Sequence, residues 1–304
     1  MGLFTGDYKL DTAHAVALGS FDGLHVGHRA LLSACMETAE KYGIKSAVCT
    51  FDINPKKVLT GTVSLLTDNE EKVRRINDVG IDDVCMERFD TEYAKMPPEE
   101  FFYKVLIGKC RAKCLVCGEN YRFGAKGKGD TELLAELCKK EGLELAVVPF
   151  VQDVGETVSS SMIRKLIENG EVDRAQRLMT VPFSISGKVT YGKGLGRKMG
   201  LPTINLNFGE DSVIPKYGVY AVKVIFDGKS YKGAANVGVR PTVDGKEVNA
   251  EVNIIDFNGD LYSKKVKIEF LRFIREEKKF SGIDELKAQI QKDKKQIEDL
   301  IKIP

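Results

Sequence analysis

The stretch AVALGSFDGLHVGH, residues 15–28, decides the architecture of the N-terminal half of the chain. Its apolar run, residues 15–18, leads into a glycine-rich turn, and a helical pattern follows the turn. A strand, a turn and a helix start gather backbone N–H groups and the imidazoles of His25 and His28 around one spot, which suits a phosphate. Gly27, between the two histidines, lets a ligand approach the backbone closely.

This segment resembles the His-x-Gly-His signature of nucleotidyltransferases, which move an adenylyl or cytidylyl group from a nucleoside triphosphate. An isolated histidine near a turn is usually a polar surface residue, and we interpret His14 in that way. The glycines around His25 and His28 favour catalytic roles for that pair instead. The residues of the same turn that we expect to contact ATP are Gly19, Phe21, Asp22 and Gly27.

Composition is typical of a globular protein with two domains, since the chain has 304 residues, 43% of them hydrophobic and 30% charged. The sequence contains no apolar run of membrane-spanning length, and its start lacks the order of a signal peptide. Seven cysteines, an odd number, favour reduced thiols and a cytoplasmic location. We therefore expect no membrane partner, and the small net charge of +2 gives no reason to expect a nucleic-acid partner.

Charge is unevenly distributed along the chain. Residues 1–180 carry 24 basic and 28 acidic groups, whereas residues 181–304 carry 22 basic and 16 acidic groups. This asymmetry indicates a domain boundary near residue 180 and an anionic ligand for the second half, although a solvated basic face explains it nearly as well. We expect domains at 1–180 and 183–304, and we leave formation of a homo-oligomer open.

Apolar runs and helical patterns alternate in the first half. The expected strands are residues 15–18, 45–51, 83–86, 114–117 and 145–148, and the expected helices are residues 29–42, 70–79, 98–107 and 132–141. This alternation predicts an α/β domain with a doubly wound parallel sheet, which binds ligands at the carboxyl ends of its strands. Both histidines of the opening segment lie just after the first strand, as that rule requires.

Short alternating segments dominate the second half. The expected strands are residues 183–189, 218–226, 231–237, 250–255 and 266–273, followed by a helix over residues 283–301 in which Ser281 and Asp284 form a capping pair. Glycine turns between these strands predict an antiparallel β-barrel or sandwich with a terminal helix. The three cysteines at 110, 114 and 117 lack a fourth ligand, so we favour structural thiols there over a metal site.

Two further clusters suit phosphates. Hydroxyl groups at residues 159–161 and the guanidinium of Arg164 begin a helical pattern, where the helix dipole favours anions, although simple N-capping by serine is common. The second cluster is the glycine-rich loop GKGLGRKMG, residues 192–200. It matches neither a dinucleotide fingerprint nor a P-loop, because a third glycine and a Ser or Thr are missing where those motifs need them. Thr203 and Asn205 follow on one face of a strand and would offer oxygen ligands to a hard cation.

The whole chain resembles one family, the prokaryotic bifunctional riboflavin kinases/FAD synthetases. In addition to the segment at 19–28, the motifs that carry the resemblance are Thr50-Phe51, the loop at 118–124, Ser159-Ser160-x-x-Ile163-Arg164, Gly200-x-Pro202-Thr203-x-Asn205, Gly218-Val219-Tyr220, Asn236-Val237-Gly238-x-Arg240-Pro241-Thr242, Glu251 before Asp256-Phe257, and Ile274-Arg275-x-Glu277-x-Lys279-Phe280. The sequence departs from the family pattern at Asn54 and Asn253, where the family often has His, and at Ser161, where it usually has Thr.

This resemblance implies a Rossmann-like nucleotidyltransferase domain followed by a flavokinase barrel. The barrel would phosphorylate riboflavin with ATP to give FMN, and the N-terminal domain would join FMN to AMP from a second ATP, giving FAD and pyrophosphate. In the barrel, Glu251 would be the general base, and Thr203 and Asn205 would position Mg²⁺. Further ATP contacts are expected at Asn120, Ser159, Ser160, Arg164, Gly192, Lys193, Gly194, Gly196 and Arg197, and flavin contacts at Arg275 and Phe280.

Two alternatives stay open at this point. The chain could transfer an adenylyl group to another small nucleotide, with a second domain that binds a flavin without catalysis. It could also be a flavin-binding regulator that has lost catalysis, but the intact His25, His28 and Glu251 argue against that reading.

Overall fold

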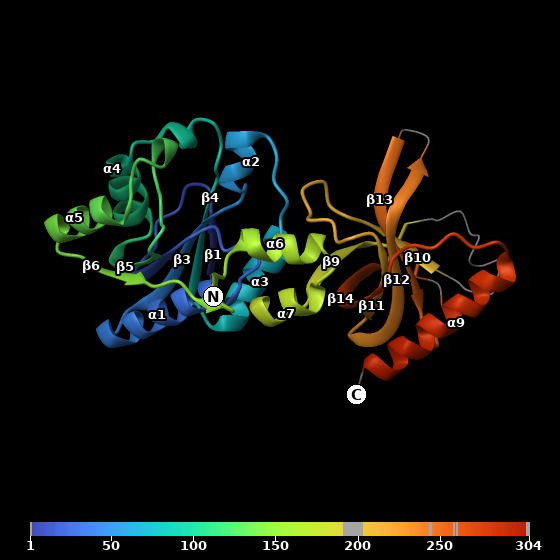
Figure 1. Ribbon diagram of the computed structural model, residues 1–304. Coiled ribbons are helices and arrows are strands. Elements are labelled where there is room, and N and C mark those ends of the chain that lie inside the picture. Colours follow the sequence, from blue (N-terminus) through green and yellow to red (C-terminus); the bar gives the residue numbers. More distant parts are fainter. Residues whose placement is uncertain (1, 191–202, 243–244, 258, 260, 302–304) are drawn as a thin grey trace. The chain divides into compact units, whose positions relative to one another are not determined.

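The chain folds into two compact units, Met1–Ser160 and Ser161–Pro304, which we describe separately. The structure, a computed structural model, describes residues 2–190, 203–242, 245–257, 259 and 261–301 (Figure 1).

The first unit is built on a parallel sheet of six strands in the order β1-β4-β3-β2-β5-β6. The strands are β1 (Gly2–Thr5), β2 (His14–Leu18), β3 (Lys45–Phe51), β4 (Asp83–Glu87), β5 (Ala112–Gly118) and β6 (Glu144–Val148). The chain moves from β2 toward one edge through β3 and β4, and β5 and β6 then extend the sheet from the other side of β2. The switch point therefore lies between β2 and β5, and ligands bind at the carboxyl ends of strands beside such a point.

Helices cover both faces of this sheet. They are α1 (Val26–Tyr42), α2 (Pro55–Thr60), α3 (Asn69–Val79), α4 (Pro98–Phe101), the π-helical turn η2 (Phe102–Lys109) and α5 (Thr131–Glu141), with short 3₁₀ turns at Tyr93–Lys95 and Ala125–Gly127. One core joins α1 and α3 to Ala15 and Ala17 of β2, and the other joins η2 and α5 to Val16 and Leu18. Successive residues of β2 thus enter opposite cores, as a strand buried on both faces requires. The predicted doubly wound α/β architecture is confirmed.

The interpretation of His14 as a surface residue is wrong, because this residue is only 1% exposed. Its Nε2 lies 3.1 Å from Oδ2 of Asp83, and its Nδ1 lies 2.7 Å from the carbonyl oxygen of Thr12. Asp83 also accepts the backbone N–H of Gly2 at 2.9 Å. His14 therefore helps to join β2 to β4 and β1 at the amino ends of the strands, opposite the end where ligands bind.

A small hairpin, β7 (Gln152–Asp153) and β8 (Glu156–Thr157), precedes helix α6 (Ser160–Glu168), which begins at the end of the first unit. In the second unit, α7 (Val172–Met179) is strongly amphipathic. Its buried residues are Val172, Ala175, Leu178 and Met179, and it packs on strands β9 and β14 of the sheet that follows.

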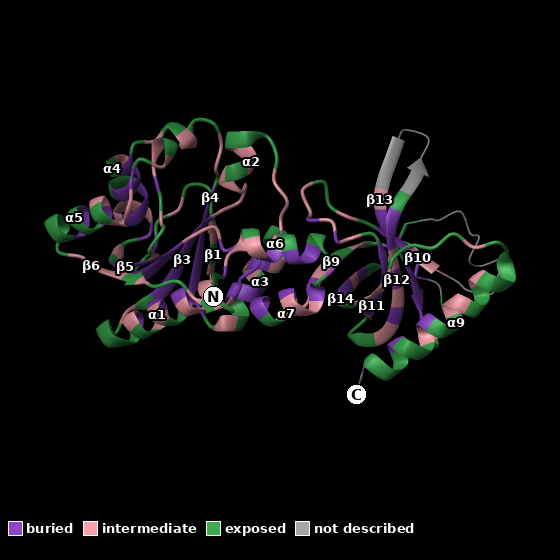
Figure 2. Cartoon of the chain, in the orientation of Figure 1, coloured by how far each residue is buried: buried purple, intermediate pink, exposed green. Residues whose placement is uncertain are grey.

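The second unit contains an antiparallel sheet in the order β10-β13-β12-β11-β14-β9. The strands are β9 (Phe183–Lys188), β10 (Thr203–Asn207), β11 (Gly218–Phe226), β12 (Lys229–Thr242), β13 (Gly245–Ile254) and β14 (Lys265–Arg275). A bridge between Thr190 and Asn205 brings the end of β9 to the opposite edge strand, β10, so the sheet curls toward a barrel. Figure 2 shows that its strands are largely buried. The predicted antiparallel barrel is confirmed.

Helix α9 (Ile283–Leu300) packs on β12 of this sheet, and its Ile297, with Ile301 just after it, joins a buried cluster with Ala221 of β11 and Ile255. The prediction of a Ser281–Asp284 capping pair is wrong. The N-cap residue is Gly282, and both the backbone N–H and the hydroxyl of Ser281 donate to Glu285 instead, at 2.8 and 2.7 Å. Among the described residues, no helix is long and apolar enough to cross a membrane.

Candidate active sites

The turn between β2 and α1 is strained. Phe21, Gly23 and Leu24 have φ angles of +51°, +81° and +42°. Residues other than glycine rarely adopt such angles, and they persist at functional sites when the surrounding structure holds them. Phe21 and Leu24 are at most 1% exposed, so packing in the core contributes to holding the turn.

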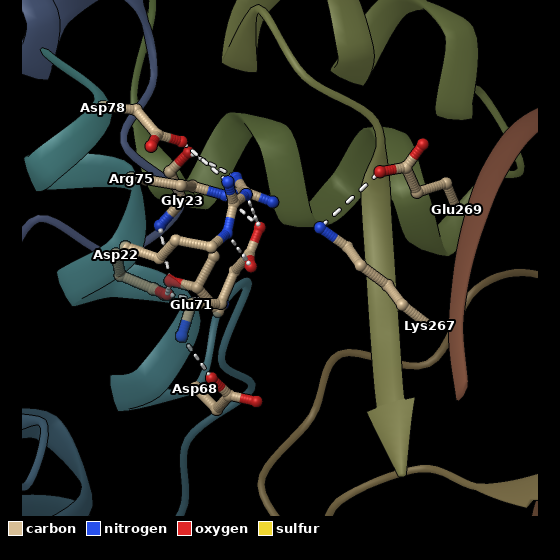
Figure 3. Close-up of polar contacts among 10 residues, drawn as sticks. Asp22, Gly23, Asp68, Glu71, Arg75, Asp78, Lys267 and Glu269 are labelled. Atoms are coloured by element: carbon tan, nitrogen blue, oxygen red, sulfur yellow. Dashed lines mark hydrogen bonds and ion pairs between the residues drawn. The ribbon is translucent and has the colours of Figure 1, made fainter. Parts of the chain in front are cut away.

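Polar contacts with the segment before α3, and with α3 itself, hold the turn as well (Figure 3). The carboxylate of Asp22 accepts the backbone N–H groups of Leu66 and Thr67 at 3.0 and 3.1 Å. Arg75, which is 2% exposed, donates to the carbonyl oxygen of Gly23 at 3.3 Å and pairs with Glu71 at 2.8 Å. Because its carboxylate is engaged with backbone groups, Asp22 supports the turn, and its predicted contact with ATP stays a prediction.

His25 and His28 are brought together at the start of α1. His25 is the N-cap residue, and its Nδ1 accepts the backbone N–H of His28 at 3.4 Å. The two rings stack with centroids 3.8 Å apart and planes 18° apart, and Phe21 lies 5.2 Å from the His28 ring. In a neutral ring, acceptance at Nδ1 places the proton of His25 on Nε2.

The environment keeps His28 uncharged. Burial, and then the neighbouring His25, hold the pKa of His28 well below its ordinary value. Its Nδ1 is buried and has no hydrogen-bond partner among the described residues. Two neutral imidazoles at a helix N-terminus, where N–H groups concentrate, form a site suited to stabilising negative charge on a phosphate.

The position of the His25 ring explains why residue 27 is a glycine. A Cβ there would lie 3.2 Å from Cε1 and Nδ1 of the His25 ring, closer than ordinary contact allows. A side chain at this position would therefore displace the imidazole of His25.

One residue of the predicted serine cluster, Ser160, contacts the same turn. Ser160 begins α6, and its hydroxyl donates to the carbonyl oxygen of Asp22 at 2.9 Å. Ser159 directly precedes it, and Asn120 is exposed in the turn after β5, the neighbour of β2. Arg164 lies farther along α6, within the second compact unit, and its contact with ATP stays a prediction.

Sequence reasoning missed Lys72, which lines a small pocket at the carboxyl ends of β2 and β3. The pocket residues are Ser20, Asp22, Phe51, Asp52, Asn54, Pro55, Leu65, Thr67, Asn69 and Lys72. The ammonium of Lys72 donates to the carbonyl oxygen of Phe51 at 2.7 Å, and burial lowers its pKa to about 8. Lys72, Arg75 and Ile76 form the buried face of α3. Their helical spacing in the sequence was the signal that could have revealed Lys72 as a buried residue.

In the second unit, the register between β10 and β13 gathers the predicted base and cation ligands. Asn205 lies opposite Glu251, and the hydroxyl of Thr203 donates to Oε1 of Glu251 at 2.7 Å. Asn249 donates to Oδ1 of Asn205 at 2.9 Å. The oxygens of Thr203, Asn205 and Glu251 thus share one face of the sheet, and they form the kind of ligand set that suits Mg²⁺.

The two predicted flavin contacts also lie together. Arg275 ends β14, and its guanidinium carbon lies 5.9 Å from the centre of the Phe280 ring. The predicted contacts of the glycine-rich loop, Gly192, Lys193, Gly194, Gly196 and Arg197, lie outside the described residues.

Comparison with known proteins matches both halves of the chain. The family model for FAD synthetase matches residues 7–162, and the family model for riboflavin kinase matches residues 179–301. Relatives named bifunctional riboflavin kinase/FMN adenylyltransferase include those of Listeria monocytogenes, 34% identical over 95% of this chain and 93% of the relative, and of Escherichia coli K12, 35% identical over 96% of each chain.

A solved structure has the same fold over almost the whole chain. It is a crystal structure described as a macrolide-efflux protein from Streptococcus pneumoniae, 32% identical, with a TM-score of 0.89 over 96% of this chain and 97% of that chain. The two domains therefore follow one another in both proteins in the same order.

Proposed function

The chain belongs to the family of bifunctional riboflavin kinases/FMN adenylyltransferases, and on that premise we propose that it makes FAD from riboflavin in two ATP-dependent steps. The first step phosphorylates riboflavin to FMN. The second joins FMN to the adenylyl group of ATP and releases pyrophosphate. The observation that carries the proposal is that each family domain has its own assembled candidate site, with stacked histidines in the first unit and the Thr203–Glu251 pair in the second.

Adenylyl transfer needs no covalent enzyme intermediate. The phosphate of FMN attacks the α-phosphorus of ATP, and the bond to the departing pyrophosphate breaks. His25 and His28 would donate hydrogen bonds to oxygens on which negative charge accumulates, and the N–H groups at the start of α1 would add to that stabilisation. Because the strained turn fixes both rings in advance, little reorganisation is needed during the reaction.

Phosphorylation of riboflavin requires removal of a proton from a primary hydroxyl group. Glu251 suits this role because its carboxylate is exposed and already accepts a hydrogen bond from a hydroxyl, that of Thr203. Thr203 and Asn205 would hold Mg²⁺, which when bound neutralises charge on the ATP phosphates. The free thiols, all seven of them buried, support a cytoplasmic location for this enzyme.

One assay separates this function from its alternatives. The purified protein is incubated with riboflavin, ATP and Mg²⁺, and the flavins are separated by chromatography. We expect FMN to appear first and FAD to accumulate after it. If the protein leaves riboflavin unchanged but converts FMN, supplied in place of riboflavin, to FAD, the second unit only binds flavin. If neither product forms, the chain is not the proposed enzyme.

A further inference from the structure

A row of residues that face each other across the second sheet joins the candidate base to Arg275. The register pairs Asn205 with Glu251, Glu251 with Asn236, and Asn236 with Val219. Val219 is in turn paired with Arg275, next to a register shift in β14. Residues directly opposite one another in antiparallel strands project from the same face. Glu251 and Arg275 therefore share a face of the sheet, separated by three strand spacings, or about 14 Å.

The guanidinium of Arg275 is held by the terminal helix. Its Nε donates to both carboxylate oxygens of Asp293 at 3.1 Å, and its Nη2 donates to Oδ2 at 2.8 Å. Asp293 lies on α9, is 4% exposed, and also accepts the side-chain amide of Gln289 at 2.8 Å. Such a forked pair fixes the plane of a guanidinium as well as its position.

The segment that follows Arg275 is anchored on the same face. Arg275 donates from Nη1 to the carbonyl oxygen of Glu276 at 3.0 Å, and Glu277 accepts the side-chain amide of Asn236 at 3.1 Å. Asn236 is the residue opposite Glu251. Phe280 thus follows closely on two anchored residues, Arg275, which is tied to α9, and Glu277, which is tied to the neighbour of the candidate base.

We propose that Asp293 is a positioning residue for riboflavin phosphorylation. In this proposal α9 contributes to the kinase site through Asp293. The inference rests on the proposed kinase activity. Asp293 holds Arg275 so that the fused ring of the substrate lies against Arg275 and Phe280 while its hydroxylated chain extends along the row to Glu251. The substrate has a planar ring at one end and its reacting hydroxyl at the other, which matches the separation of these groups.

Asp293→Asn tests this role in the full-length protein, because it removes the charge and one acceptor without changing size. We expect the KM for riboflavin to rise about tenfold to a hundredfold, the scale on which misplacing a binding group acts. The KM for ATP and kcat should change little, since Asp293 acts on the binding of the ring. Adenylylation of supplied FMN should be unchanged. Asp299→Asn, an exposed aspartate on the same helix, is the matched control and should leave every constant as in the parent.

A double-mutant cycle separates positioning from simple stability. Arg275→Met should itself raise the KM for riboflavin, and Asp293→Asn added to it should have no further effect. If the two effects add in full, Asp293 does not act through Arg275 and the proposal is overturned. Should Asp293→Asn prevent folding, Gln289→Met leaves the Asp293–Arg275 pair in place but removes the amide that supports it, and a smaller rise in the same KM is expected.

Two further results overturn the inference without touching the proposed function. One is an Asp293→Asn protein with the parental KM for riboflavin. The other is a Gln289→Met protein with an unchanged KM, where only that variant folds. Failure of the parent protein to phosphorylate riboflavin would instead contradict the proposed function itself.

Discussion

His25 and His28 stack with their ring centroids 3.8 Å apart, and the ring of one caps the helix on which the other lies. The N-cap hydrogen bond uses the Nδ1 lone pair of His25, and burial keeps His28 uncharged. The side chain of His25 thus both caps α1 and forms half of the stacked pair, so a change at His25 alters both. A change at His28 removes the stacking partner but keeps the backbone N–H that the cap uses.

His28→Ala removes one preorganised contact to the reacting phosphate. We expect FAD formation from FMN to fall about 10²–10³-fold, the range for loss of one such donor. FMN formation from riboflavin should be unchanged, because it takes place in the other unit. His14→Ala is the contrasting variant, since it should lower the thermal midpoint and leave the kcat of the folded protein close to the parent. Equal loss of both activities in His28→Ala would mean that the histidines serve folding.

The pH dependence of adenylyl transfer tests whether His28 acts as a neutral group. Because its pKa lies well below its ordinary value, His28 stays neutral above about pH 6.5. We therefore expect the rate of FAD formation not to fall as pH rises from 6.5 to 8. A rate that falls through this range would show that a protonated imidazole is required.

The same shift has a consequence for stability. The unfolded chain takes up a proton at His28 near pH 6.5, whereas the folded protein does so only at lower pH. The free energy of unfolding should therefore decrease as pH falls below about 6.5, and His28→Asn should weaken that decrease. Denaturant titrations of parent and variant between pH 5 and pH 7 measure the difference.

Lys72 should make the first unit more stable as pH rises. Burial lowers its pKa to about 8, against an ordinary value near 10.5, so the unfolded state binds the proton more tightly between those values. Lys72→Met should flatten this slope and raise stability at pH 7 by up to about 3 kcal/mol, less the loss of its hydrogen bond to Phe51. Lys139→Met, at an exposed position, should leave the slope unchanged. If the parent shows no rise between pH 8 and pH 10, this account of Lys72 is wrong.

The boundary between the domains can be tested with two fragments. We propose that residues 183–304 and residues 161–304 both convert riboflavin to FMN and make no FAD. The longer fragment should be more stable by several kcal/mol, because it keeps the buried Val172, Leu178 and Met179 of α7, each worth about 1.5–3 kcal/mol. A folded 161–304 fragment that is inert toward riboflavin would contradict the division of labour between the units.

Local patterns predicted the elements whose apolar residues form long runs. They did not predict β1, because Gly2–Thr5 has only four residues and is half exposed, and it pairs at the sheet edge with β4, about 80 positions away in the chain. For β10, the sequence predicted only that Thr203 and Asn205 lie on a strand, and it gave no bounds for that strand.

Buried charged groups were harder to predict than the fold. Lys72 and Arg75 have carbonyl partners at Phe51 and Gly23, and the buried Asp293 has Arg275 as its partner. A sequence pattern assigns such residues to solvent, because the partners that satisfy them come together only in the folded protein. The clusters at residues 25–28 and 203–205 were recognisable because their residues lie close together in the sequence.

The most direct test of the central claim is the product pattern of Glu251→Gln. This change keeps the size of the side chain and removes the base, so conversion of riboflavin to FMN should fall about 10²–10⁴-fold. Supplied FMN should still be converted to FAD at the parental rate, and riboflavin should still bind. If Glu251→Gln phosphorylates riboflavin as fast as the parent, or loses both activities together, the two-site account is contradicted.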